Sequence, residues 1–120
     1  DAAGALGPGA ASMGPPDGTF LLARRPDGSV AACGGVQRHD ATTGEIKRMW
    51  VAPHARGAGL GRRMLTELEQ AAARLGYTEV VLDTNATLAE AIAMYESAGY
   101  VAIERYNDNP YAQHWFRRAL

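Results

Sequence analysis

The segment Arg48–Leu65, with the sequence RMWVAPHARGAGLGRRML, decides how the fold of this chain is interpreted. An apolar run ends at Pro53, and glycines then stand at positions 57, 59 and 61. From position 60 to position 75 apolar side chains recur with helical spacing, and Gly76 supplies a stop signal. The glycines therefore join a predicted strand to a predicted helix.

Arginines flank these glycines at positions 56, 62 and 63, and the combination indicates an anion-binding turn. The first amides of a helix lack intrahelical partners and lie at the positive end of its dipole, and glycines let the backbone close around a phosphate. The Walker loop is excluded because Arg62-Arg63 stands where Lys-Ser/Thr is needed, and the dinucleotide fingerprint would need glycine at position 62. The alternative is an ordinary strand-to-helix turn with solvated arginines.

Three antiparallel strands are expected before the turn, over residues 19–25, 30–37 and 45–52. Gly34 and Gly35 indicate a bulge in the second of them. Alternation in the third strand predicts two faces, with Ile46, Arg48 and Trp50 on one and Lys47, Met49 and Val51 on the other.

After the helix the chain continues as an α/β pattern. A buried strand over residues 79–84 implies a parallel crossover, and Asp83 at its end is expected to cap a turn. A capping box at 87–90 opens a second helix that ends at Gly99. Strands are expected over 100–106 and 112–120, with a helix as the alternative for the second segment, and the Asn and Pro residues between them are typical of a loop.

The composition predicts one domain over residues 19–120, preceded by a flexible Gly/Ala/Pro-rich tail or linker over residues 1–18. A net charge of −1 gives no reason to expect a nucleic-acid partner, and no apolar stretch is long enough to cross a membrane. The single cysteine favours a cytoplasmic location. The three histidines are dispersed, so no metal site is expected.

The glycine-arginine turn resembles motif A of the GNAT superfamily of acyl-CoA-dependent N-acetyltransferases. The family signature Gln/Arg-x-x-Gly-x-Gly/Ala is matched by Arg56-Gly57-Ala58-Gly59-Leu60-Gly61, and AIAMYESAGY, residues 91–100, is similar to the family segment A-x-x-x-Y-x-x-x-G-F/Y. The resemblance runs from about Thr19 to the carboxyl end. It implies an α/β fold with a mixed, mostly antiparallel sheet flanked by helices. The strand and two helices that the family places before this point are not found in residues 1–18, so the chain is interpreted as a fragment or as one completed by a partner.

The resemblance further implies transfer of an acetyl group from acetyl-CoA, as co-substrate, to a primary amine. The pantetheine arm would lie between two diverging strands. The cofactor contacts would come from Met49, Val51, Arg56, Gly57, Ala58, Gly59, Leu60, Gly61 and Arg62. Tyr95 would donate a proton to the departing thiolate, although its spacing also suits a core aromatic. The base would be Glu45 or water, and Glu45 could equally be a solvated charge at a strand end. Many relatives carry Asn where this chain has Leu88.

The acceptor is expected to be a small-molecule amine rather than a protein, and a homodimer is possible. One alternative is a non-catalytic module that binds or senses acyl-CoA. Another is an ordinary α/β domain whose glycine turn binds a different phosphate ligand, such as a nucleotide.

Overall fold

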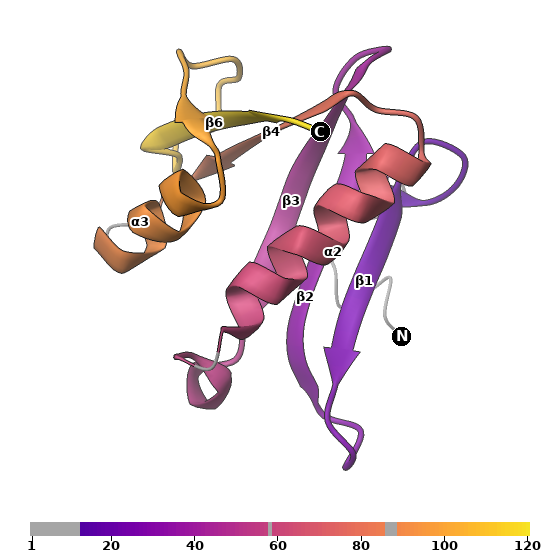
Figure 1. The fold of residues 1–120 in the computed structure, drawn as a ribbon, viewed down its shortest axis with the longest axis vertical. Coiled ribbons are helices and arrows are strands. Elements are labelled where there is room, and N and C mark those ends of the chain that lie inside the picture. Colours follow the sequence, from indigo (N-terminus) through magenta and orange to yellow (C-terminus); the bar gives the residue numbers. More distant parts are fainter. Residues whose placement is uncertain (1–12, 58, 86–88) are drawn as a thin grey trace.

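A computed structural model describes residues 13–57, 59–85 and 89–120, and it shows a six-stranded sheet with helices packed against it (Figure 1). The elements are β1 (Thr19–Arg24), β2 (Val30–Arg38), β3 (Thr43–Val51), η2 (Pro53–Ala55), α2 (Leu60–Arg74), β4 (Glu79–Thr84), α3 (Ala89–Ser97), β5 (Val101–Ala102) and β6 (His114–Ala119). The strand order is β1-β2-β3-β4-β6-β5, and only β3 and β4 pair in parallel. The predicted mixed, mostly antiparallel α/β fold is confirmed.

Helix α2 covers one face of the sheet and supplies the centre of the core. Leu65 and Leu68 are 1% and 0% exposed. A Cβ atom built on Gly34 of β2 would lie 2.6 Å from the Leu68 side chain, so a glycine is needed there for the helix to approach the strand. The helix follows its predicted spacing and is followed by Gly76, whose φ of 100° suits the predicted stop.

The opposite face of the sheet is partly covered by the segment before β1. Met13 is 3% exposed, and a Cβ built on Gly35 would clash with its side chain. Gly34 faces α2, and neighbouring strand residues face opposite sides of the sheet, so Gly35 and Met13 lie on the side away from α2. Tyr77 Oη also donates to the Asp17 carbonyl oxygen at 2.6 Å. Residues 13–18 of the predicted tail thus pack against the domain; residues 1–12 lie outside the described part, and the domain boundary stays a prediction.

Strand β3 contains a bulge, whereas the sequence analysis expected the bulge in the neighbouring strand, β2. Cys33 pairs with Trp50 and Gly35 with Lys47, so one residue of β2 faces two residues of β3. The bulge falls opposite the predicted glycine pair, and its backbone includes Arg48 at a φ of 57°.

This bulge makes the predicted two-face alternation of the third strand wrong. Ile46 belongs to the core, and Met49 and Val51 pack against the same core, whereas Arg48 and Trp50 are exposed. The extra residue shifts the side-chain phase by one position. Ile46 therefore shares a face with Met49 and Val51.

The predicted strand over residues 100–106 is much shorter than expected. Strand β5 has two residues, and one further backbone bond joins the Ile103 amide to the Trp115 carbonyl oxygen at 2.9 Å. The chain then leaves the sheet, and Tyr106 turns toward Glu45. The capping box at 87–90 lies largely outside the described residues, as Thr87 and Leu88 are not described.

Candidate active site

Strands β3 and β4 are paired at their beginning and then diverge. Their parallel ladder has three residue pairs and ends at Glu45 and Val81. Beyond this point β3 continues to Val51, while β4 stays paired with β6 through Thr84. The β3 edge that faces β4 therefore leaves its ladder at residue 46, and a strand edge of this kind can pair with an extended ligand.

The glycine turn at the start of α2 depends on left-handed backbone conformations. Gly57 has a φ of 86° and Gly59, the N-cap residue, has a φ of 76°. A Cβ on either would meet no atom within 4 Å, so conformation rather than space requires these glycines. Gly59 has no side chain with which to cap this end of α2, so the first amides of the helix are suited to binding an anion. Ala58 lies outside the described residues.

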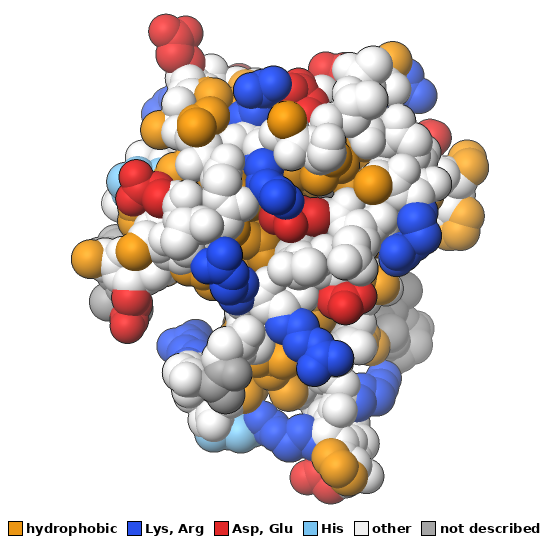
Figure 2. All heavy atoms as spheres, viewed as in Figure 1, with side chains coloured by type: hydrophobic (Ala, Val, Ile, Leu, Met, Phe, Trp, Pro, Cys, Tyr) orange, Lys and Arg blue, Asp and Glu red, His pale blue; other side chains and the backbone are white. Residues whose placement is uncertain are grey.

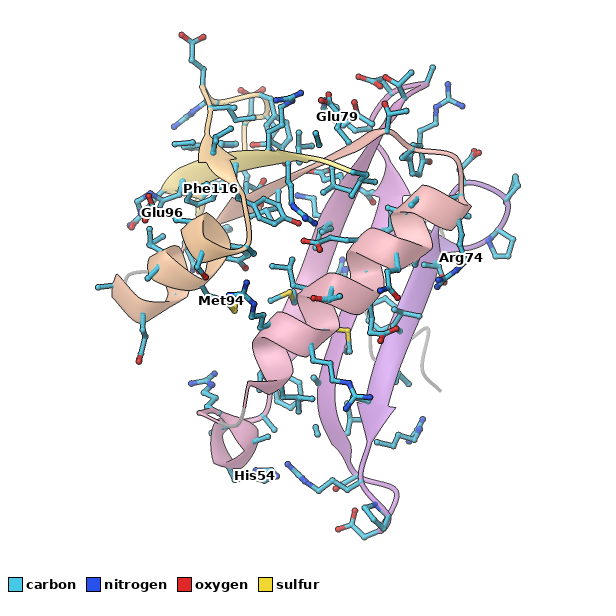
Figure 3. The ribbon with its side chains drawn as sticks, in the orientation of Figure 1. His54, Arg74, Glu79, Met94, Glu96 and Phe116 are labelled. Atoms are coloured by element: carbon cyan, nitrogen blue, oxygen red, sulfur yellow. The ribbon has the colours of Figure 1, made fainter. Side chains whose placement is uncertain are left out.

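A groove of about 730 Å³ runs between this turn and α3. The predicted cofactor contacts that line it are Met49, Val51, Arg56, Gly57, Gly59, Leu60, Gly61 and Arg62. Ala91, Met94 and Tyr95 form its wall on α3. Met94 projects between the two helices (Figure 3), where its Sδ would lie 3.6 Å from a Cβ built on Gly61. The surface is hollowed between α3 and the turn before α2, and basic and acidic side chains are interspersed on this side of the molecule (Figure 2).

The two predicted arginines line the groove but their guanidinium groups bind protein atoms. Arg56 Nε donates to the Val51 carbonyl oxygen at 3.3 Å. Arg62 donates to Ser97 twice, at 2.6 Å to Oγ and at 3.3 Å to the carbonyl oxygen, and so ties the start of α2 to the end of α3. The backbone amides of the turn are therefore better placed than these side chains to bind a phosphate.

Tyr95 lies on α3 where the core meets the groove. It is 8% exposed, and its ring stacks on Phe116 at a centroid distance of 5.6 Å and meets the edge of Tyr100 at 5.8 Å. The tyrosine is thus a core aromatic and also a lining residue. Burial raises the pKa of the Tyr95 phenol, so it carries its proton at neutral pH, as a proton donor must.

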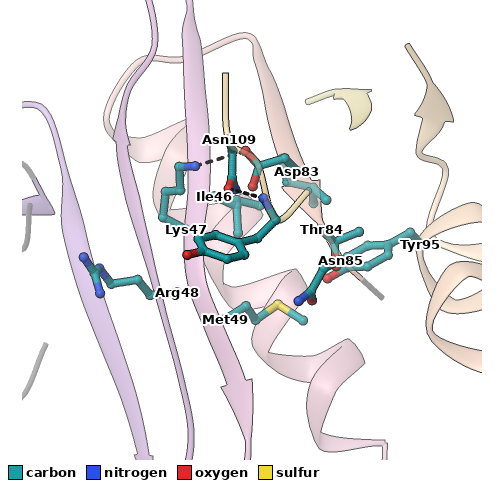
Figure 4. A pocket seen from close by; sticks show the side chains of 11 residues that line it. Ile46, Lys47, Arg48, Met49, Asp83, Thr84, Asn85, Tyr95 and Asn109 are labelled. Carbon is teal, nitrogen blue, oxygen red and sulfur yellow. Dashed lines mark hydrogen bonds and ion pairs between the residues drawn. The ribbon is translucent and has the colours of Figure 1, made fainter. Parts of the chain in front are cut away.

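A second cavity, of about 280 Å³, passes through the gap between the diverging strands (Figure 4). Ile46 and Leu82 line it from the core side of the sheet, whereas Lys47 and Asp83 line it from the other face, because neighbouring strand residues point to opposite faces. The two cavities share Met49, Thr84, Asn85 and Tyr95. They therefore meet beside Tyr95.

Glu45 sits at the last pair of the parallel ladder and is 6% exposed, so the expectation of a solvated strand-end charge is wrong. Its Oε1 accepts a hydrogen bond from Gln37 Nε2 at 2.9 Å. Its Oε2 accepts from Tyr106 Oη at 2.7 Å and lies 3.2 Å from Lys47 Nζ. The lining of the smaller cavity begins at the next residue, Ile46, so Glu45 is close to the gap without facing it.

Asp83 is the carboxylate that lines the smaller cavity, and the sequence analysis gave it only a turn-capping role. Lys47 Nζ lies 3.2 Å from its Oδ2, which also accepts a hydrogen bond from Asn107 Nδ2. Burial alone would raise the pKa of Asp83, but the hydrogen bond from Asn107 and the charge and hydrogen bond of Lys47 outweigh it and hold the pKa below its ordinary value. The sequence analysis missed this role because it depends on the strand register: residues 45 and 81 are paired, and this pairing brings positions 47 and 83 side by side.

The loop between β5 and β6 holds this polar cluster in place. Asn107 Oδ1 accepts from Trp115 Nε1 at 3.0 Å, which fixes its amide so that Nδ2 faces Asp83. Burial, and then the hydrogen bond to Glu45, raise the pKa of Tyr106. Within residues 13–57, 59–85 and 89–120, no three His, Cys, Asp or Glu side chains converge as a metal ion would require. In that same part of the chain, no helix has the length and apolar character needed to cross a bilayer.

Known proteins share both the sequence and the fold. An uncharacterized N-acetyltransferase of Schizosaccharomyces pombe is 39% identical over 98 residues, which are 81% of this chain and 60% of the relative. The chain thus spans less than two thirds of the length of that relative. The structure of a GNAT-family acetyltransferase from Staphylococcus aureus Mu50 superimposes with a TM-score of 0.78 at 19% identity, covering 85% of this chain and 68% of that one.

A GNAT-family acetyltransferase from Elizabethkingia anophelis, with acetyl-CoA bound, superimposes with a TM-score of 0.72 at 19% identity, over 87% of this chain and 77% of that one. At 19% identity these two structures support the assignment of the fold alone. The sequence profile of the acetyltransferase (GNAT) family matches residues 9–100. With the sequence and the fold in agreement, this chain belongs to the GNAT family of acetyltransferases.

Proposed function

We propose that this chain transfers an acetyl group from acetyl-CoA to the primary amine of a small-molecule acceptor. The observation that carries the proposal is the meeting of two cavities beside Tyr95. The larger one reaches the glycine turn on the helical side of the sheet, and the smaller one opens between the diverging strands toward the other face. A donor and an acceptor entering by these two routes would meet in the gap.

The groove suits acetyl-CoA in its chemistry. The open amides at the start of α2 would hold the diphosphate. The β3 edge from residue 46 to Val51 would pair with the amide groups of the pantetheine arm. Apolar side chains of Leu60 and Met94 line the path between them. The acetyl-CoA bound by the E. anophelis relative supports this assignment.

The reaction forms a bond between the amine nitrogen and the acetyl carbon and breaks the bond between that carbon and sulfur. Tyr95 would give its proton to the departing thiolate, because its phenol is protonated and lines both cavities. Both oxygens of Glu45 already accept hydrogen bonds, and the residue does not line the smaller cavity. We therefore assign removal of the amine proton to water rather than to direct contact with Glu45.

Release of free thiol from acetyl-CoA in the presence of primary amines tests the proposal. We expect Tyr95→Phe to lower kcat by about 100-fold or more, the usual contribution of a positioned proton donor, and to leave acetyl-CoA affinity unchanged. Tyr100→Phe is the matched control, since it removes the hydroxyl of the neighbouring ring, which donates to Glu69 at 2.8 Å. That variant should lose stability and keep kcat.

The thiol-release assay and a thermal-stability measurement with added ligands separate the alternatives. A wild-type chain that binds acetyl-CoA and releases no thiol with any amine would be a binding module. Thermal stabilisation by ATP but not by acetyl-CoA would point to a nucleotide site, because a specific ligand raises the stability of the state that it binds.

A further inference from the structure

An aromatic side chain, Tyr111, stands at the mouth of the smaller cavity on the face of the sheet away from α2. It belongs to the loop between β5 and β6, and it is one of the residues that line the cavity. The loop lies on that face because Asn107 and Asn109 both hydrogen-bond Asp83, which faces the same way (Figure 4). Tyr111 is therefore placed where the acceptor of the proposed reaction would enter.

The ring of Tyr111 is exposed although its backbone is held in place. The residue is 78% exposed, more than any other large apolar side chain among the described residues. Its amide donates to Asn109 Oδ1 at 3.0 Å, and the next residue, Ala112, is 7% exposed. In the described part of the chain no other ring stacks on it. An exposed ring on an anchored backbone offers a preformed surface to a planar ligand.

The charges around the cavity favour an aryl tail on the acceptor over a second ammonium. The charged side chains that line it, within the described residues, are Lys47, Arg48 and Asp83. Lys47 Nζ lies 3.2 Å from Asp83 Oδ2, so these two form an ion pair. Two cations and one carboxylate give an ammonium tail no net attraction. Cations are attracted to the faces of aromatic rings, so the same surroundings suit an aryl group.

We propose that Tyr111 is a specificity-determining residue that stacks on an aromatic ring of the acceptor, and that the pocket selects primary amines joined to an aryl group by a short arm. The inference rests on the proposed transfer reaction and names the substrate class for its acceptor pocket. The amine would lie toward Tyr95 and the aryl group toward Tyr111, because both tyrosines line this cavity. Its volume of about 280 Å³ limits the acceptor to a small molecule.

Three primary amines test the proposal: 2-phenylethylamine, 2-cyclohexylethylamine and putrescine. We expect kcat/KM to fall in that order for the wild-type chain. The first two share the arm and the ring size, so their ratio measures stacking, which should contribute about 2- to 10-fold. Tyr111→Ala should reduce kcat/KM for 2-phenylethylamine by about 10-fold or more through KM, because both stacking and buried apolar area are lost. The value for putrescine should change by less than about 3-fold, since no ring contact is lost there.

Two further variants separate stacking from a structural effect. Tyr111→Phe keeps the ring and should retain kcat/KM for 2-phenylethylamine within about 3-fold. Val101→Ala is the matched control, because Val101 is another exposed apolar residue, at 54%, and lines neither cavity. It should leave the order of the three amines intact. Equal losses for all three amines in Tyr111→Ala, equal wild-type values for the two ring-bearing amines, or putrescine as the best acceptor would overturn the proposal.

A binding measurement keeps this test separate from that of the transfer reaction. Calorimetric titration of 2-phenylethylamine into the chain saturated with CoA reports binding without turnover. Binding by the wild type and Tyr111→Phe, with a clear loss in Tyr111→Ala, supports the aryl site even if no thiol is released from acetyl-CoA, which would sink only the transfer reaction. No binding by the wild type, or equal binding by all three chains, overturns the site.

Discussion

Replacing Gly59 by alanine tests whether the left-handed bend before α2 forms the anion site. At a φ of 76° an L-residue costs about 1–2 kcal/mol, offset by about 0.4–1 kcal/mol from the less flexible unfolded chain. We expect Gly59→Ala to lose about 1 kcal/mol of stability. Gly76→Ala is the matched control, because Gly76 has a φ of 100°, its Cβ would also meet no atom within 4 Å, and it lies beyond the far end of α2, outside the groove. It should lose a similar amount of stability, about 1 kcal/mol.

Thermal unfolding and acetyl-CoA titration measure the two consequences. A loss of about 1 kcal/mol corresponds to roughly 4 °C in a domain of this size, so Gly59→Ala and Gly76→Ala should both melt lower than the wild type by about that amount. If the alanine at position 59 turns the backbone amide away from the ligand, acetyl-CoA affinity should fall about 10-fold or more in Gly59→Ala and should stay close to that of the wild type in Gly76→Ala. Equal affinities in the two variants would refute the assignment of the diphosphate to these amides.

Two further predictions concern the bulge and the charge cluster. Because Arg48 has a φ of 57°, Arg48→Val should cost at least about 1 kcal/mol more than Arg48→Gly in urea unfolding; equal costs would show that this conformation is not maintained. The folded-state pKa of Asp83 is lowered, so its contribution to stability is present above the ordinary Asp value of about 4 and is lost as pH falls through the folded-state pKa. Wild-type stability should therefore fall more steeply than that of Asp83→Asn below about pH 4, and parallel curves would contradict the assigned ion pair.

The elements with strong local signals could be predicted from the sequence. Helix α2 follows its apolar spacing from Leu60 and stops before Gly76, and β4 has the predicted bounds Glu79–Thr84. The glycine turn could also be located, because positive φ angles select glycine. The resemblance to the GNAT family then correctly indicated the family, while the roles of individual site residues stay predictions.

The face on which each side chain of β3 lies could not be predicted, because it is set by the pairing of β3 with β2 and not by the sequence of β3 itself. Period-two alternation assumes one residue per step of the ladder, and nothing in EIKRMWV marks the place where β3 gains a residue. The register with β2 decides it: the glycine pair faces the bulge, but the extra residue belongs to the partner strand. Glycines in one strand thus indicated an irregularity of the sheet without showing which strand carries it.

The charged cluster beside the smaller cavity could not be predicted from the sequence, for a related reason. Glu45, Lys47, Asp83, Tyr106 and Asn107 come from two strands and a loop that are far apart in sequence, and each alone reads as a strand-end charge or a turn residue. What joins them is the end of the β3–β4 ladder at Glu45 and Val81, because the next residues on that face, Lys47 and Asp83, remain within reach of each other while the strand backbones begin to separate. The point of divergence therefore opens the gap that we propose as the path of the donor, and it collects charged groups on the other face of the sheet. A shift of the ladder by one pair would move both together, so the proposed donor path and the charged cluster depend on a single feature of the backbone.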